Sequence, residues 1–149
     1  MRGLVCLTAL SLSAPALTEP TGRWWSGFGQ GTTEYGIKND SAGSDSFYMV
    51  CAPDRTYVSL RIGGREPRKG ETVTVTIGRD EFTLFLGENG YFETNSHVNH
   101  DTYLALWAAI REGADMRVRL ATGQSTNFTL LGAAKILPRE ACATDFARF

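Results

Sequence analysis

The chain has 149 residues, 42% of them hydrophobic, and its 15 basic and 16 acidic residues give a formal net charge of −1 at pH 7. This length suits a single domain, and the near-neutral charge argues against a nucleic-acid-binding protein, because such proteins carry a basic surplus or stripe. After the N-terminal region, no apolar run approaches the roughly 20 residues of a membrane-spanning helix, so no membrane span is expected.

Residues 1–16, MRGLVCLTALSLSAPA, have the three parts of a secretory signal peptide. Arg2 precedes an apolar run from Leu4 to Ala14, and a small-residue motif, Ala-Pro-Ala, ends at Ala16. A buried N-terminal helix is the alternative, but the proline and the polar residues after it would end such a helix abruptly. We therefore predict cleavage after Ala16 and a periplasmic or secreted mature protein.

The cysteine count predicts one disulfide. Cys6 lies in the predicted signal peptide, so the mature chain keeps Cys51 and Cys142. An even number of cysteines in an exported protein favours pairing, and closing a loop of about 90 residues stabilises a fold by roughly 4–5 kcal/mol in the chain-entropy model. A reactive thiol is the alternative, but no histidine or lysine lies close to Cys51 in the sequence to lower its pKa.

Residues 17–33, LTEPTGRWWSGFGQGTT, form an aromatic and glycine-rich segment ahead of a single β-rich domain at 34–149. The segment carries Trp24, Trp25 and Phe28, which a plain linker would not. These side chains either cover one end of the core or form an exposed patch. Trp24 and Trp25 are therefore candidate binding residues, because tryptophan is frequent at binding hot spots.

From residue 34 onward, apolar residues alternate with polar ones, which is the pattern of half-buried strands. Turns rich in glycine, proline or asparagine separate the predicted strands, which span 34–39, 46–51, 56–62, 72–77, 81–86, 91–95, 115–121 and 127–131. The run at 91–95 is expected to pair back after the Asn89–Gly90 turn. Short strands joined by hairpin turns predict a mainly β fold, an antiparallel β-sandwich or open barrel.

Between two of these strands the apolar period becomes that of a helix. The apolar stripe consists of Tyr103, Leu106, Trp107 and Ile110. Asp101 is expected to cap the helix and Gly113 to end it, which predicts an amphipathic helix over 101–112 packed against the sheet. A short C-terminal helix over 132–142 would carry Cys142.

No catalytic residue, metal site or cofactor is predicted. His97 and His100 form an H-x-x-H pair beside Asp101, but a metal site needs three or four ligands, and a solvated turn followed by a helix cap explains all three residues. No serine lies in a G-x-S-x-G motif, and no glycine-rich phosphate loop opens a helix. A carboxylate pair for glycoside hydrolysis stays open, because the separation of two carboxylates is a property of the structure.

The loop GGREPRKGE at 63–71 is a second candidate for binding. The loop could bind an anionic sugar or an acidic partner through Arg65, Arg68 and Lys69. The alternative is a loop that is only solvated. A protruding loop with polar side chains would also suit an inhibitor that enters the active-site cleft of a hydrolase.

Several motifs follow one another in an order that resembles a group of exported bacterial proteins. These motifs are the strand FYMVC, the hairpin VTVTIGRDEFTLFLGENGYFETN, the helix–strand unit LWAAIREGADMRVRLA and the closing run NFTLLGAAKILPREAC. Over residues 34–142 the order is similar to that of the invasion-associated locus B proteins and of the VasI-like accessory proteins of type VI secretion. The resemblance implies a periplasmic, non-catalytic β-sandwich with one helix and one disulfide.

The sequence leaves three functions open. The first is a non-catalytic binding or accessory module of the bacterial envelope, whose partner is another protein or an envelope component. The second is a periplasmic inhibitor of a hydrolase such as lysozyme, acting through the loop at 63–71. The third is an enzyme with a histidine–aspartate or carboxylate site, which needs His97 or His100 inside a pocket with another titratable group. We expect the first function, with no enzymatic activity and no nucleic-acid partner.

Overall fold

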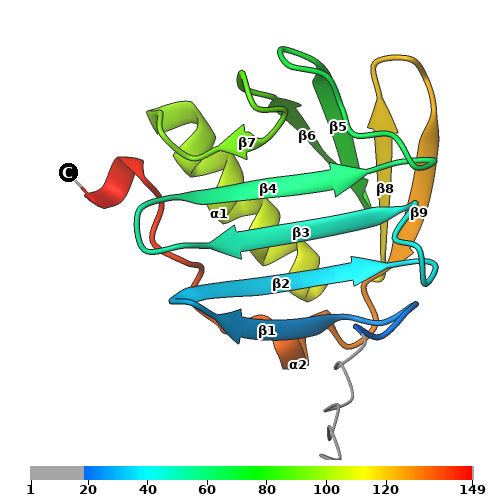
Figure 1. Ribbon diagram of the computed structural model, residues 1–149, viewed down its shortest axis with the longest axis horizontal. Coiled ribbons are helices and arrows are strands. Elements are labelled where there is room, and N and C mark those ends of the chain that lie inside the picture. The colour runs from blue at the N-terminus through cyan, green and yellow to red at the C-terminus, as the bar shows by residue number, and fades with distance from the viewer. Residues whose placement is uncertain (1–18, 149) are drawn as a thin grey trace, which may run out of the picture.

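The computed structural model describes residues 19–148, in which two antiparallel sheets enclose one core (Figure 1). The first sheet, in spatial order, consists of β1 (Trp25–Gly29), β2 (Thr32–Lys38), β3 (Ser46–Cys51), β4 (Thr56–Arg61) and β7 (Phe92–Glu93). The second consists of β6 (Asp80–Phe85), β5 (Thr72–Ile77), β8 (Asp115–Leu120) and β9 (Ser125–Thr129). The helical elements are α1 (His97–Glu112), α2 (Ala133–Ile136) and the 3₁₀ turn η1 (Phe146–Arg148). The prediction of a mainly β sandwich is confirmed, and the predicted signal peptide at 1–16 lies outside the described residues.

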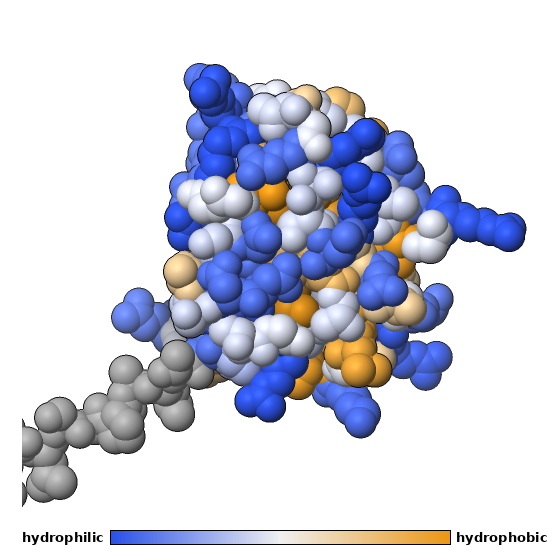
Figure 2. Space-filling model, turned by 90° about the vertical axis from the view of Figure 1, so that its right-hand side faces the viewer, coloured by the Kyte–Doolittle hydropathy of each residue, from blue (hydrophilic) through white to orange (hydrophobic). Residues whose placement is uncertain are grey.

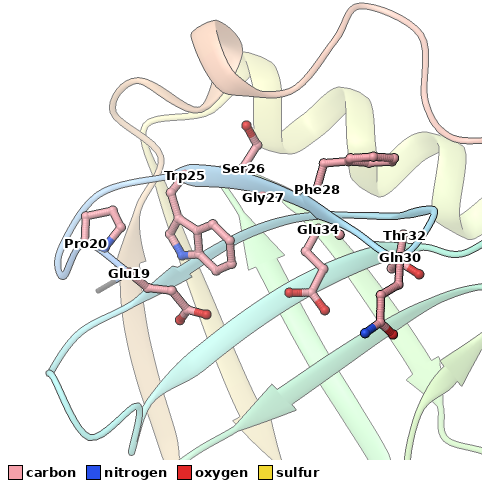
Figure 3. Close-up of a pocket in the computed structure, with 10 residues that line it drawn as sticks. Glu19, Pro20, Trp25, Ser26, Gly27, Phe28, Gln30, Thr32 and Glu34 are labelled. Carbon is pink, nitrogen blue, oxygen red and sulfur yellow. The ribbon is translucent and has the colours of Figure 1, made fainter. Parts of the chain in front are cut away.

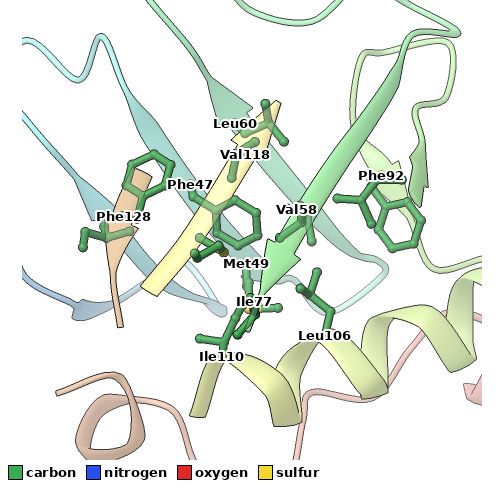
Figure 4. Close-up of a cluster of buried hydrophobic side chains, with 14 of the residues drawn as sticks. Phe47, Met49, Val58, Leu60, Ile77, Phe92, Leu106, Ile110, Val118 and Phe128 are labelled. Carbon is green, nitrogen blue, oxygen red and sulfur yellow. The ribbon is translucent and has the colours of Figure 1, made fainter. Parts of the chain in front are cut away.

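The core lies between the two sheets and is closed on one side by α1. Side chains from both sheets and from α1 meet in one cluster (Figure 4). The alternation read from the sequence produces this arrangement, because successive strand residues point to opposite faces. In β5, for example, Val73, Val75 and Ile77 are buried, and they pair in register with Leu120, Val118 and Met116 of β8.

The predicted apolar stripe of α1 is confirmed, because Tyr103, Leu106, Trp107 and Ile110 are its buried residues. The predicted start of the helix is wrong. α1 begins at His97, and its cap is Ser96, whose hydroxyl accepts a hydrogen bond from the Asn99 N–H at 3.2 Å. Asp101 therefore lies inside the helix. The apolar stripe does not extend into the first turn, because the one apolar residue there, Val98, is exposed and the others are polar.

The pairing of β7 differs from the expectation. Residues 91–95 do not return to the 81–86 strand: β7 pairs with β4 of the other sheet, with Phe92 opposite Val58. The turn between β6 and β7 is closed by the Gly87 N–H, which donates to the Tyr91 carbonyl at 2.8 Å. This turn therefore carries the chain from one sheet to the other. Periodicity identifies a strand but says nothing about which sheet it joins.

The disulfide predicted between Cys51 and Cys142 is confirmed, with their Cα atoms 6.0 Å apart and 91 residues of separation. Cys51 ends β3, as expected. Cys142, however, does not lie on a helix over 132–142. α2 ends at Ile136, two residues before Pro138, and the chain then runs irregularly to Cys142. Proline cannot supply the N–H that would continue a helix, which explains the early end.

The N-terminal segment is part of the sandwich, because residues within 17–33 form β1 and its hairpin with β2. Gln30 and Gly31 form the turn with φ angles of 52° and 77°, which is the geometry of a two-residue type I′ hairpin. Trp24 is buried, and its indole N–H donates to the Thr129 carbonyl of β9 at 2.9 Å. Of the two alternatives for the segment, Trp24 covers the core, and this side chain holds the segment onto the second sheet.

Candidate functional site

β1 is an edge strand that α2 contacts, and its outer backbone groups form no hydrogen bond with any other part of residues 19–148. In a two-residue hairpin the pair that closes the turn is hydrogen-bonded, and bonded and non-bonded pairs alternate from there. Gly29 and Thr32 close this turn, so Gly27 is also bonded to β2, whereas the backbone groups of Ser26 and Phe28 point away from β2. Both residues are exposed, Phe28 by 77%. Within residues 19–148, neither Ser26 nor Phe28 finds a hydrogen-bond partner on that side.

A hollow of about 600 Å³ runs along this edge and is named here the β1 groove. Its lining consists of residues 25–30 together with Glu19, Pro20, Thr32 and Glu34. Ser26 and Phe28 point to one face of the sheet, and Trp25 and Glu34 to the other (Figure 3). The groove therefore wraps around the free strand edge, where an added strand would lie.

The edge of the second sheet nearest to β1 is blocked by side chains. The outer carbonyl groups of β9 already accept hydrogen bonds: that of Asn127 from the Asn39 side-chain amide at 3.0 Å, and that of Thr129 from Trp24. Such coverage is how native proteins prevent a strand edge from pairing with another chain. β9 is therefore not available in the way β1 is.

The two remaining edges are also protected. β7 has only two residues, and its Glu93 carbonyl accepts a hydrogen bond from the Asn99 side chain at 2.7 Å. β6 opens with the charged, exposed residues Asp80 and Glu81 and packs near α1. β1 contains no charged residue. α2 contacts β1, but among residues 19–148 no side chain or backbone group forms a hydrogen bond with the outer backbone groups of Ser26 and Phe28.

Two aromatic rings lie over glycines on the outer face of the first sheet. A side chain at Gly36 would clash with the Tyr48 ring, and a Cβ at Gly27 would lie 3.0 Å from the ring of Trp25. Trp25 and Tyr48 contact each other edge to face, with centroids 5.8 Å apart. The glycines therefore let these rings lie close against the sheet beside the β1 groove.

The groove is acidic. Glu19 forms an ion pair with Lys38 at 3.4 Å and accepts a hydrogen bond from the Tyr48 hydroxyl at 3.3 Å. Burial, and then the charge of Glu19, raise the pKa of Tyr48 to about 12, so its hydroxyl stays protonated and can donate. Glu34 has no ion-pair or side-chain hydrogen-bond partner in the described part of the chain. The lining contains no basic residue.

In the basic loop at 63–71, two of the three basic side chains form ion pairs with glutamates of the same chain. Arg65 forms a two-point ion pair with Glu71, at 2.8 and 3.2 Å, which raises the pKa of Arg65 and lowers that of Glu71. Lys69 pairs with Glu88, whereas the Arg68 side chain is exposed. A second hollow is lined by Arg65, Arg68, Lys69, Gly70, Glu71, Ala121 and Thr122. It shares no residue with the β1 groove. The structure thus separates the candidate binding residues into two places.

The two histidines lie in the first turn of α1, not in a solvated turn before it. His97 is exposed and lies 3.4 Å from Asp101. His100 is half-buried, with its Nδ1 atom 2.5 Å from the Thr144 hydroxyl and its ring tilted against Phe146. His100 therefore helps to hold the C-terminal segment against α1.

Three further features concern the surface, membrane crossing and metal binding. Seen from the side that carries β8 and β9, the molecule is covered mostly by hydrophilic residues (Figure 2). No helix among residues 19–148 combines the length and the apolar composition that a membrane crossing requires. In the same residues, no group of three or more His, Cys, Asp or Glu side chains is placed to hold a metal ion.

Ser26 and Glu34 were not identified from the sequence, whereas Trp25 was a candidate binding residue and Phe28 was named with it as a side chain of the core or of an exposed patch. The available signal was the alternation in WSGFG followed by the turn-forming pair Gln30–Gly31. Glycine is rare in strands, and three glycines between residues 27 and 31 hide the pattern. Glu34 could be linked to Trp25 only through the register of the hairpin.

A protein-family model described as YfjT matches residues 22–137, a range that includes β1 and every other strand. The search of curated proteins found no significant match, and neither did the search of solved structures. The family match does not name the invasion-associated locus B or VasI-like proteins, so that resemblance stays a prediction. Because the match covers well over half of the sequence, the chain belongs to the YfjT family.

Proposed function

We propose that the protein is a non-catalytic binding module of the bacterial envelope that takes up an extended segment of a partner protein on the free edge of β1. The observation that carries this proposal is that the outer backbone groups of Ser26 and Phe28, inside the β1 groove, have no hydrogen-bond partner within residues 19–148. An extended peptide added to such an edge gains affinity from main-chain hydrogen bonds and specificity from side chains on alternate faces. Ser26 and Phe28 supply the free backbone groups for this pairing.

The proposed envelope location has two supports. The first is the signal-like pattern of residues 1–16. The second is the Cys51–Cys142 disulfide, because disulfides persist in oxidising compartments such as the periplasm and are rare in the cytosol. Both are general features of exported proteins, so the proposal names the compartment and not a pathway.

The charge of the groove favours a polypeptide with basic residues as the occupant. Glu19 and Glu34 contribute two carboxylates to the lining and no basic side chain balances them there, although Glu19 is paired with Lys38 behind it. A second copy of this chain is a poorer occupant, because β1 contains no basic residue that could pair with the carboxylates of the groove.

Two other functions draw less support from the contacts. An inhibitory loop at 63–71 would need free polar groups, but Arg65 and Lys69 already pair with Glu71 and Glu88. An enzyme would need a histidine in a pocket with another titratable group. His100 instead contacts Thr144 and Phe146.

Replacement of Ser26 by proline is expected to weaken peptide binding at least about tenfold, because it removes a free backbone donor and places a ring on the pairing side. The matched control is Ser26→Ala, which changes the side chain but keeps the N–H and should bind within about threefold of wild type. The probe is a bead-bound library of random octapeptides, from which binders are selected with the mature disulfide-bonded protein and their dissociation constants measured by fluorescence anisotropy.

Both variants should melt close to wild type, because proline is tolerated on an edge strand where its nitrogen faces solvent. Equal binding by wild type and Ser26→Pro would show that the peptides bind elsewhere. A library that yields no binder would also contradict the proposed function.

A further inference from the structure

We propose that Trp25 and Glu34 form a pocket for one lysine or arginine side chain of the bound segment. This inference rests on the proposed function, because the segment is the strand added to β1. Trp25 would supply the face of an aromatic ring and Glu34 a carboxylate, the two groups that together recognise a cationic side chain.

The register of the β1–β2 hairpin brings the two side chains together. Glu34 is directly opposite Gly27, and Trp25 is two residues before Gly27, so all three lie on the outer face of the sheet. The Trp25 ring leans along the strand toward Gly27, where a Cβ would lie 3.0 Å from the ring. Trp25 and Glu34 point to the same side of the strand in Figure 3. Only a glycine therefore separates the ring from the carboxylate across the hairpin.

The same register sets the position of the incoming side chain. In a strand added to β1, the residue opposite Gly27 must point to the same face as Gly27, since paired residues share a face. On that face the Trp25 ring covers Gly27, which has no side chain of its own. The side chain of the opposite residue is thus directed to the space beside the Trp25 ring and the Glu34 carboxylate, while its neighbours point to the Phe28 face.

Among the carboxylates of the groove, Glu34 is the one without an ion-pair partner in residues 19–148. Glu19, the other carboxylate of the groove, is paired with Lys38. Arg55, which lies at the turn between β3 and β4, has its guanidinium over the Tyr57 ring at 4.5 Å and forms no ion pair with Glu34. Within residues 19–148, Glu34 is half-buried on an acidic groove with no basic partner. A lysine or arginine from outside the chain would supply one.

The test uses a defined strand-forming peptide with one variable position. The probe is an acetylated and amidated octapeptide of alternating threonine and valine, with lysine, arginine, norleucine or glutamate at one central position. We expect the lysine and arginine peptides to bind the mature protein about five- to tenfold more tightly than the norleucine peptide. This advantage should shrink as salt is raised from 0.05 to about 0.5 M, because exposed charge pairs are screened.

Glu34→Gln should remove the advantage of the lysine peptide and leave the norleucine peptide within about twofold of its wild-type affinity. The matched control is Glu81→Gln, which removes an exposed carboxylate on β6 and should preserve the advantage. Trp25→Leu keeps an apolar side chain without the ring and should also reduce the preference for lysine.

The outcomes separate this inference from the function on which it rests. Equal binding of the lysine and norleucine peptides, with both lost in Ser26→Pro, would overturn the cation pocket and leave strand addition standing. If no peptide of the set binds and the random library also fails, both proposals fall. Binding of a soluble chito-oligosaccharide that depends on Trp25 but not on the Ser26 N–H would overturn the cation pocket in favour of a glycan site.

Discussion

Removal of the disulfide by the double substitution Cys51→Ser and Cys142→Ser is expected to lower the free energy of unfolding by about 4 kcal/mol. The bond closes a loop of 91 residues, which includes every element from the end of β3 to the segment after α2. In the chain-entropy model a loop of this size restricts the unfolded chain strongly, so its loss favours unfolding. This is one of the two largest effects that we expect from any small change to the molecule.

The C-terminal segment should stay in place in the reduced native protein, because other contacts hold it. The Thr56 hydroxyl donates to the Ala143 carbonyl at 2.7 Å, and the Thr56 N–H donates to the Asp145 carboxylate at 2.8 Å. The variant should therefore fold and bind as wild type does, with a lower midpoint in urea. Wild type unfolded with excess dithiothreitol is the control and should match the variant. A difference from oxidised wild type below about 1 kcal/mol would contradict the expected role of the bond.

Trp107→Ala is expected to cost about 3–5 kcal/mol of stability, the range for truncating a fully buried aromatic side chain. Trp107 is only 2% exposed, and its ring packs edge to face on Tyr35 of β2, with centroids 5.3 Å apart. Its indole N–H donates to the Pro138 carbonyl at 3.0 Å, which ties α1 to the segment after α2. The substitution therefore creates a cavity and leaves a carbonyl group without its donor.

Leu104→Ala is the matched control on the same helix, because Leu104 is 40% exposed and lies off the apolar stripe. This change should cost less than about 1 kcal/mol in the same urea titration. If Trp107→Ala and Leu104→Ala had similar effects, α1 would not be the structural element that closes the core.

Some features were predicted well because the residues within them are enough to specify their structure. β5 alternates without interruption, and its Val73 and Val75 are fully buried as expected. The α1 stripe around Trp107 likewise followed from its spacing. The disulfide followed from a count of cysteines in a chain expected to be exported. In each case one local rule, independent of the rest of the fold, gives the answer.

The features that were missed depend on contacts between distant parts of the chain. β1 is rich in glycine and gains its structure from pairing with β2 and from the Trp24 hydrogen bond to Thr129. The proximity of Trp25 and Glu34 depends on a hairpin register that no single residue type specifies. The free edge of β1 could be recognised only after the other edges were found to be covered. The candidate site therefore depends on the order and register of the strands, which the spacing of apolar residues does not specify.

Amide hydrogen exchange at Ser26 and Phe28 tests strand addition most directly. In the free protein both N–H groups should exchange rapidly, whereas Gly27, bonded to β2, should be protected. Saturation with a selected or lysine-containing octapeptide should slow exchange at Ser26 and Phe28 at least about tenfold, because each N–H then donates to the added strand. Unchanged exchange at both residues while the peptide is bound would contradict the account.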